Sequence, residues 1–351
     1  MLEALGEPRA MALVGLFGGV LLGLAARLGR FCSMGAVEDA LYGNDTKRLR
    51  MWGIAIGVAI IGSFIAEAMG AAAIKDSIYL TTAWSPLASI LGGLAFGYGM
   101  ALAGNCGFGA LARVGGGDFR SFVIVLIMGL SAYAVLSGPL AGLRLMLFPV
   151  HSVENTPAGI AHSLGGVLGI SATVIGVLIG VAILIGALAN RSLLQKPQMI
   201  FWAVVAGLAV LSGWIGTTWI SENGFAAREV VSHTFAAPLG ETMVYLMTAS
   251  GRNMSFAVGS VAGVLLGAFA GSLIKGQFRW EARDDPRELR RQVFGATLMG
   301  AGAAIALGCT VGQGLSAFST LAFSAPVTAA SIFAGAAIGL RQLIAGFERI
   351  A

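Results

Sequence analysis

The sequence predicts an all-α, polytopic membrane protein with about nine transmembrane helices, short re-entrant helices between them and an internal inverted repeat. Hydrophobic residues make up 57% of the 351 residues, charged residues only 11%, and the mean hydropathy is +0.84. A soluble domain cannot bury so much apolar surface. Long uncharged runs also recur along the chain, and one pattern of glycines around a cysteine occurs twice.

A helix needs about 20 apolar residues to cross a bilayer, and several of the uncharged runs are shorter. The expected spans are residues 11–26, 51–73, 87–103, 121–139, 167–189, 199–220, 254–274, 293–308 and 325–340. We expect the first span to be retained, because residues 1–10 lack the basic region and cleavage site of a signal peptide. Residues 1–351 then form a single membrane domain.

Basic residues gather in alternate loops. They cluster after the first, third, fifth and seventh spans, whereas the loops at 74–86, 140–166 and 221–253 hold one or two each. The positive-inside rule places the basic loops in the cytoplasm. We therefore expect the N-terminus outside and the C-terminus in the cytoplasm. The net charge of +5 reflects this topology, and no nucleic-acid partner is expected.

A segment around Cys106 recurs around Cys309, 203 residues later (309 minus 106). At this spacing Gly92, Gly97, Gly99, Ala101, Ala103, Cys106 and Gly109 correspond to Gly295, Gly300, Gly302, Ala304, Ala306, Cys309 and Gly312. The repeats are expected at about 11–140 and 199–345. The charge pattern gives them opposite orientations, as in transporters whose broken helices meet near the membrane midplane. The counterpart of the segment around Cys32 is expected at residues 213–228.

Two runs of glycine at every fourth residue predict closely packed helices rather than a binding site. They are Gly15, Gly19 and Gly23 in the first span, and Gly259, Gly263, Gly267 and Gly271 in the seventh.

The cysteines Cys32, Cys106 and Cys309 are odd in number and lie in separate segments without a CxxC spacing, which predicts free thiols. A free cysteine is often only a small buried apolar residue. Here, however, all three lie where an apolar helix gives way to a glycine-rich turn. This placement favours a functional role over core packing.

Glycine turns followed by a short helix expose backbone N–H groups and a partial positive charge, so Gly107–Gly109 and Gly312–Gly314 are candidate anion cradles. A cysteine adds a soft, polarizable sulfur, which suits an anion that itself contains sulfur. A thiolate would repel such an anion, and burial away from cations favours the protonated thiol. We therefore expect the working form to be S–H.

The other candidate substrate-binding residues adjoin the cysteines, and they are Arg30, Ser33, Asn105, Gly107, Gly308, Thr310 and Gln313. The polar side chains either donate to substrate oxygens or satisfy the backbone of a broken helix. Arg30, with Arg27, either meets the anion or anchors the end of the first span. The three histidines lack ligand spacing and no P-loop is found, so no metal or cofactor is expected.

The segments GRFCSMGA, GNCGFGALARVGGGDFR and GCTVGQGLSAFS resemble the three cysteine motifs of the YeeE/YedE sulfur-transport family, and the resemblance covers nearly the whole chain. It implies an hourglass-shaped bacterial inner-membrane protein that passes thiosulfate between the thiols of Cys32, Cys106 and Cys309. Cys106 and Cys309 would lie closest to the narrow middle, and Cys32 toward the cytoplasm. A small cytosolic sulfur carrier of the TusA type is the implied partner.

Three other functions stay open at this point. A membrane sulfurtransferase would hold sulfur as a cysteine persulfide, and a transporter would carry another sulfur or selenium compound. A non-transporting subunit would use its thiols only for packing or redox sensing. The energy source and the oligomeric state are not determined by these residues.

Overall fold

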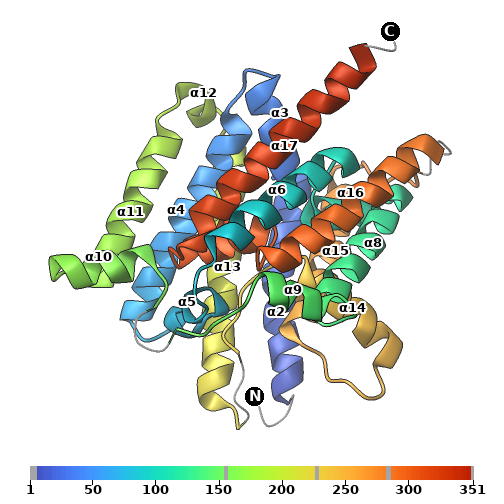
Figure 1. Ribbon diagram of the computed structural model, residues 1–351. Coiled ribbons are helices and arrows are strands. Elements are labelled where there is room, and N and C mark those ends of the chain that lie inside the picture. The colour runs from blue at the N-terminus through green and yellow to red at the C-terminus, as the bar shows by residue number, and fades with distance from the viewer. Residues whose placement is uncertain (1–5, 154–156, 226–228, 282–285, 349–351) are drawn as a thin grey trace.

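The computed structural model describes residues 6–153, 157–225, 229–281 and 286–348, and these residues are almost entirely helical (Figure 1). Within those ranges the only β pairing is three isolated bridges. Seven helices in them are long and apolar enough to cross a membrane. The predicted class, an all-α polytopic membrane protein, is confirmed.

Each of the nine predicted spans falls on one long helix. These helices are α2 (Glu7–Leu28), α4 (Lys47–Ala68), α6 (Pro86–Ala103), α8 (Phe119–Leu136), α11 (Ala172–Leu188), α13 (Pro197–Asn223), α15 (Phe256–Ile274), α16 (Pro286–Ile305) and α17 (Ser324–Glu348). Two of them differ from the seven clear spans, because α11 has only 17 residues and α16 begins with a charged first turn. The number of nine crossings therefore stays a prediction.

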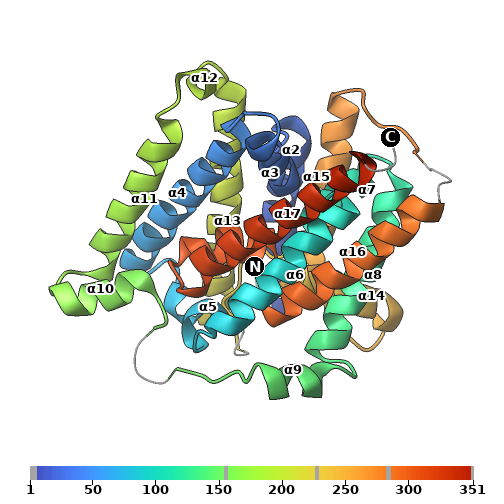
Figure 2. The ribbon, with the colours of Figure 1, turned by 45° about the horizontal axis from the view of Figure 1, so that its top comes forward.

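Short helices fill the connections. They are α3 (Ser33–Leu41), α5 (Ile78–Thr81), α7 (Gly107–Val114), α9 (Ala141–Leu147), α10 (Ile160–Leu168), α12 (Arg191–Leu194) and α14 (Ala237–Thr248). Figures 1 and 2 show α10 and α11 at one side of the bundle, where α11 packs on α4. Figure 1 shows α3 and α12 toward one end of the molecule and α5 and α9 toward the other. We call these the α3 end and the α9 end.

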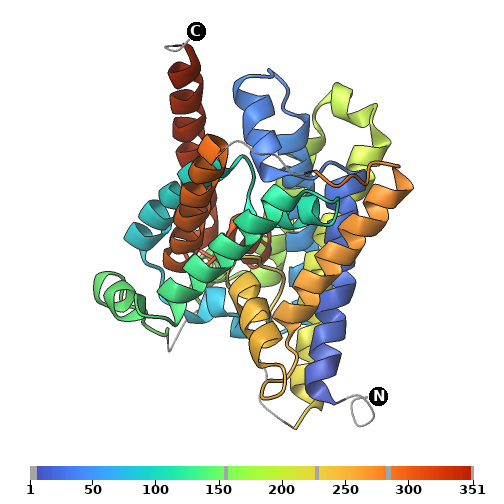
Figure 3. The ribbon, with the colours of Figure 1, turned by 90° about the vertical axis from the view of Figure 1, so that its right-hand side faces the viewer.

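The helices that carry the two glycine runs are closely packed, as predicted, and the structure shows that they pack against each other. α2 and α15 lie side by side and parallel (Figure 3). A side chain on Gly19 would overlap the backbone of Ser260 and Gly263, and one on Gly263 would overlap the backbone of Leu16 and Gly19. Only glycine allows the two backbones to approach so closely.

The helix contacts form matched pairs, as an inverted repeat would produce. α2 packs on α15 as α13 packs on α4, and α6 packs on α17 as α16 packs on α8. α6 and α16 cross in opposite directions, with Gly92 against Gly302 and Gly99 against Gly295. This symmetry supports the proposed repeat, whose boundaries remain a prediction.

Candidate substrate-binding site

Each cysteine caps the N-terminus of a helix with its sulfur. The Sγ atoms of Cys32, Cys106 and Cys309 accept hydrogen bonds from the backbone N–H three residues later, at 3.5, 3.3 and 3.5 Å. The helices that follow are α3, α7 and a segment at 310–319 that contains a π-helical stretch, Gly312–Ala317. Helix N-termini carry a partial positive charge, so each thiol lies where an anion is favoured.

The three breaks share one backbone geometry. The residue two positions before each cysteine is left-handed, with φ of 56° at Arg30, 79° at Gly104 and 55° at Leu307. This region suits glycine, and a residue with a side chain there costs roughly 1 kcal/mol or more. Arg30 and Leu307 adopt it nonetheless, and among the three only Gly104 is a residue that suits it.

Cys32 and Cys106 flank a single glycine. A Cβ atom placed on Gly109 would lie 3.6 Å from the Sγ of Cys106 and 4.0 Å from the Sγ of Cys32. Cys106 is fully buried, whereas Cys32 is partly exposed. The two thiols therefore face the same small space, one from the interior and one from a more open side.

Cys309 meets a different set of neighbours. Its Sγ accepts a hydrogen bond from the N–H of Phe235 at 3.3 Å and lies 3.7 Å from the hydroxyl of Thr234. A Cβ on Gly312 would lie 2.5 Å from Thr234 Oγ1 and 3.3 Å from the hydroxyl oxygen of Tyr79. These hydroxyls lie beside Gly312, whereas the thiol of Cys32 lies beside Gly109.

Phe235 connects the two hairpins. While its N–H binds Cys309, its carbonyl oxygen lies 3.4 Å from the position of a Cβ on Gly107, and its ring lies 5.3 Å from that of Phe108. Cys106 and Cys309 are 0% and 1% exposed, so neither faces the lipid. Both lie in the interior, on two sides of one residue.

A basic cavity of about 270 Å³ reaches Cys32 from the α3 end. Its charged wall residues are Arg27, Arg30, Arg48, Arg113, Lys275 and Glu38. Burial and the nearby Arg30 and Arg27 lower the pKa of Lys275, which follows the end of α15. Five cations against one carboxylate create a local positive potential, which attracts anions.

A second cavity lies at the α9 end. Its polar wall residues include Tyr79, Arg144, Gln313 and Ser324, and Leu307 adds an apolar part close to Cys309. The two cavities thus approach the thiols from opposite ends, with buried Cys106 and Cys309 between them. This is the arrangement that an hourglass shape requires.

Comparison with known proteins identifies the family. The family described as "Sulphur transport" matches residues 28–338. The chain belongs to this family. It is 28% identical to the thiosulfate transporter TsuA of Escherichia coli over 329 residues, with 87% of each chain covered. It is 25% identical to the thiosulfate transporter TsuA of Spirochaeta thermophila, covering 92% of this chain and 96% of the relative.

Membership confirms the predicted resemblance and makes the chain a multi-pass membrane transporter rather than an enzyme.

The expected site residues of this transporter fall into three groups. Arg30 lines the basic cavity near Cys32. Within the described residues, the guanidinium groups of Arg30 and Arg113 form no hydrogen bond or ion pair, which leaves both for an anion.

A second group lies at the broken helices around Cys106 and Cys309, where Gln313 supports the backbone. The amide of Gln313 donates to the carbonyls of Ala306 and Leu307, at 2.9 and 3.3 Å, and its oxygen accepts from Ser324. A Cβ on Gly107 would lie 2.5 Å from the sulfur of Met128, and one on Gly308 would lie 3.0 Å from the Gln313 side chain. The buried Oδ1 of Asn105 has no hydrogen-bond partner in the described part of the chain.

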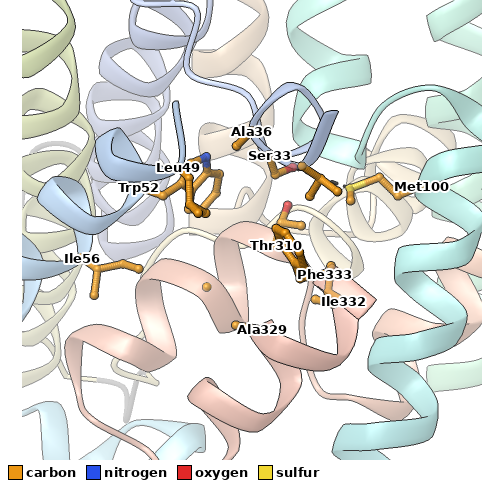
Figure 4. A pocket seen from close by; sticks show the side chains of 12 residues that line it. Ser33, Ala36, Leu49, Trp52, Ile56, Met100, Thr310, Ala329, Ile332 and Phe333 are labelled. Atoms are coloured by element: carbon orange, nitrogen blue, oxygen red, sulfur yellow. Dashed lines mark hydrogen bonds between the residues drawn. The ribbon is translucent and has the colours of Figure 1, made fainter. Parts of the chain in front are cut away.

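The third group faces elsewhere. Ser33 and Thr310 line an apolar cavity between α3, α4, α6 and α17, together with Trp52, Met100 and Phe333 (Figure 4). The hydroxyl of Ser33 donates to the sulfur of Met100 at 3.7 Å. The two residues that follow Cys32 and Cys309 are thus brought together, but in a cavity of apolar rather than charged character.

Several site residues were not foreseen. Gly35 is one of them, although the spacing C-x-x-G occurs at all three cysteines and would have placed Gly35 beside Gly109 and Gly312 of the expected anion cradles. Tyr79 and Thr234 carry no such signal. The expectation that residues 213–228 correspond to the Cys32 segment stays a prediction, because residues 213–223 belong to α13 and residues 226–228 lie outside the described ones. Thr234 and Phe235, which precede α14, contact Cys309.

Proposed function

We propose that this transporter takes up thiosulfate, or a related sulfur-containing anion, by passing it between the protonated thiols of Cys309, Cys106 and Cys32. The observation that carries the proposal is the row of three helix-capping sulfurs between a basic cavity at one end and, at the other, a cavity that contains Arg144. The names of the two curated relatives point to the same substrate.

The chemistry of the row suits such an anion. The helix N-termini attract its negative charge, and a thiol offers a weak S–H donor to its terminal sulfur. A thiolate at 4 Å would instead repel a unit charge by about 4 kcal/mol at an effective dielectric constant near 20. Weak, repeated contacts also favour release, which transport requires as much as binding.

We further propose that the protein lies in the bacterial inner membrane with the α9 end outside and the α3 end in the cytoplasm. The basic cavity would then receive the anion after Cys32, next to any TusA-type carrier that accepts its sulfur. Reporter fusions at both termini test this orientation: the N-terminal fusion should be active only as an external reporter, and the C-terminal one only as a cytoplasmic reporter.

Uptake of labelled thiosulfate into proteoliposomes, with sulfate as competitor, tests the transport itself. The unsubstituted protein should show saturable uptake, and Cys106→Ala and Cys309→Ala should each reduce it to background. Gly186→Ala is a matched control, because Gly186 is exposed on α11 and a Cβ there meets nothing within 4 Å. Normal uptake by both cysteine variants would refute the thiol path.

The intact mass of the protein tests the sulfurtransferase alternative. Transport by hydrogen bonding leaves the thiols unmodified, so the intact mass after exposure to thiosulfate should not change. A stoichiometric gain of one sulfur atom on Cys32 or Cys106 would instead show a persulfide.

A further inference from the structure

Two hydroxyl groups from distant parts of the chain meet at the Cys309 cap. Tyr79 lies on α5, and Thr234 lies in the segment before α14. Both approach Gly312, at 3.3 and 2.5 Å from the position of a missing Cβ, and Thr234 also lies 3.7 Å from the sulfur of Cys309. The space beside this thiol is therefore lined by oxygen donors.

Hydroxyl and thiol groups select different atoms of a ligand. An O–H group is a strong donor to oxygen, whereas an S–H group is a weak donor. Beside Gly109 the neighbouring group is the thiol of Cys32, but beside Gly312 it is a pair of hydroxyls. The Cys309 site is consequently better suited to the oxygen atoms of an oxyanion than the Cys106 site is.

The cavity at the α9 end supplies a charge for the same ligand. Tyr79 belongs to its wall, and Arg144, on α9, is the only charged side chain among the described residues that line it. The Nε of Arg144 is buried without a hydrogen-bond partner in the described part of the chain. A guanidinium with an unused N–H that faces a cavity is a ready partner for oxyanions.

We propose that Arg144, Tyr79 and Thr234 form an outer subsite that holds the oxygen atoms of a sulfur oxyanion while its terminal sulfur points to Cys309. This inference rests on the proposed function and adds an orientation to it. Arg144 captures the anion in the cavity, and the two hydroxyls bind its oxygens where the thiols begin. The anion then enters the row of thiols with its terminal sulfur leading and its oxygen atoms behind.

The test is the concentration of labelled thiosulfate that half-saturates uptake into proteoliposomes. Tyr79→Phe, Thr234→Val and Arg144→Gln should each raise this concentration about tenfold, the effect of losing a charge-assisted or buried hydrogen bond. Thr234→Ser and Arg144→Lys keep the donor or the charge, and they should recover most of the loss.

Arg252→Gln is the matched control, because Arg252 is exposed in the loop between α14 and α15, at the same end of the molecule but outside the cavity. It should leave half-saturation unchanged. Raising the ionic strength should weaken capture by the unsubstituted protein more than by Arg144→Gln, since salt screens the attraction between the guanidinium and an anion approaching from solution.

The results separate this inference from the proposed function. If Tyr79→Phe and Arg144→Gln transport with unchanged half-saturation and salt dependence, the outer subsite is refuted while thiosulfate transport stands. If the unsubstituted protein shows no saturable uptake, the proposed function fails and the subsite with it. A purely structural role of Thr234 would lower the thermal unfolding midpoint equally in the valine and serine variants, and that result would also refute its part in the subsite.

Discussion

The hairpins around Cys106 and Cys309 have the same frame and different neighbours. In both, a left-handed residue precedes the cysteine by two positions and a glycine follows it by three. In both, the sulfur accepts the N–H of that glycine. The first thiol then faces a second thiol, and the other faces the hydroxyls of Thr234 and Tyr79.

This difference shows how two hairpins with the same backbone geometry come to offer an anion different binding groups. The frame gives each end the same helix N-terminus, so both hairpins favour an anion. The tertiary neighbours decide whether oxygen or sulfur chemistry surrounds it. The cavities add to the asymmetry, because the described wall has five cations beside Cys32 and only Arg144 near Cys309.

The largest expected effect comes from replacing the thiols by hydroxyls. Serine can accept the same backbone N–H groups, so Cys106→Ser and Cys309→Ser should fold. Uptake should fall by at least about tenfold in both, since a change of roughly 1.4 kcal/mol at one step has that effect. The loss should be greater for Cys106, which faces another sulfur. Equal losses, measured by initial uptake rates, would break the distinction between the two hairpins.

Replacing Gly109 or Gly312 by alanine should change the stability of the protein to different extents. At Gly312 the new methyl group would lie 2.5 Å from Thr234 Oγ1, whereas at Gly109 its nearest contacts are ordinary ones of 3.6 Å or more. Gly312→Ala should therefore lower the free energy of unfolding by about 1–3 kcal/mol, as overpacking usually does.

Gly109→Ala should keep the thermal unfolding midpoint and still slow uptake, because the methyl group fills the space between two thiols. A scan of thermal unfolding beside the uptake assay measures both variants. A stable Gly312→Ala protein with normal uptake would show that the hydroxyls are not held against the Cys309 cap.

The smallest expected effect is that of making the second hairpin resemble the first. Thr234→Cys places a thiol beside Gly312, as Cys32 lies beside Gly109. We expect uptake at saturation to fall by no more than about threefold, less than 1 kcal/mol, while half-saturation rises because the thiol is a weaker donor to oxygen. An unchanged half-saturating concentration would indicate that the hydroxyl of Thr234 does not bind the oxygen atoms of the substrate.

Most of the fold follows from local sequence, because a bilayer imposes its own length and composition on each crossing. All nine uncharged runs coincide with long helices, and the glycine runs of α2 and α15 lie in closely packed helices as predicted. The exceptions are also physical. α11 and α16 are short or charged at one end, so composition alone does not establish them as spans.

Some features of the site also follow from local sequence, and others depend on tertiary packing. The sequence by itself determined that three thiols follow helix breaks, because glycine turns and apolar runs are local signals. Only the tertiary structure decided that Tyr79 and Thr234 meet at Gly312, and that Ser33 and Thr310 share an apolar cavity. Those neighbours depend on how segments far apart in the chain pack, and close contacts between glycine-lined backbones, such as those of α2 and α15, contribute to that packing.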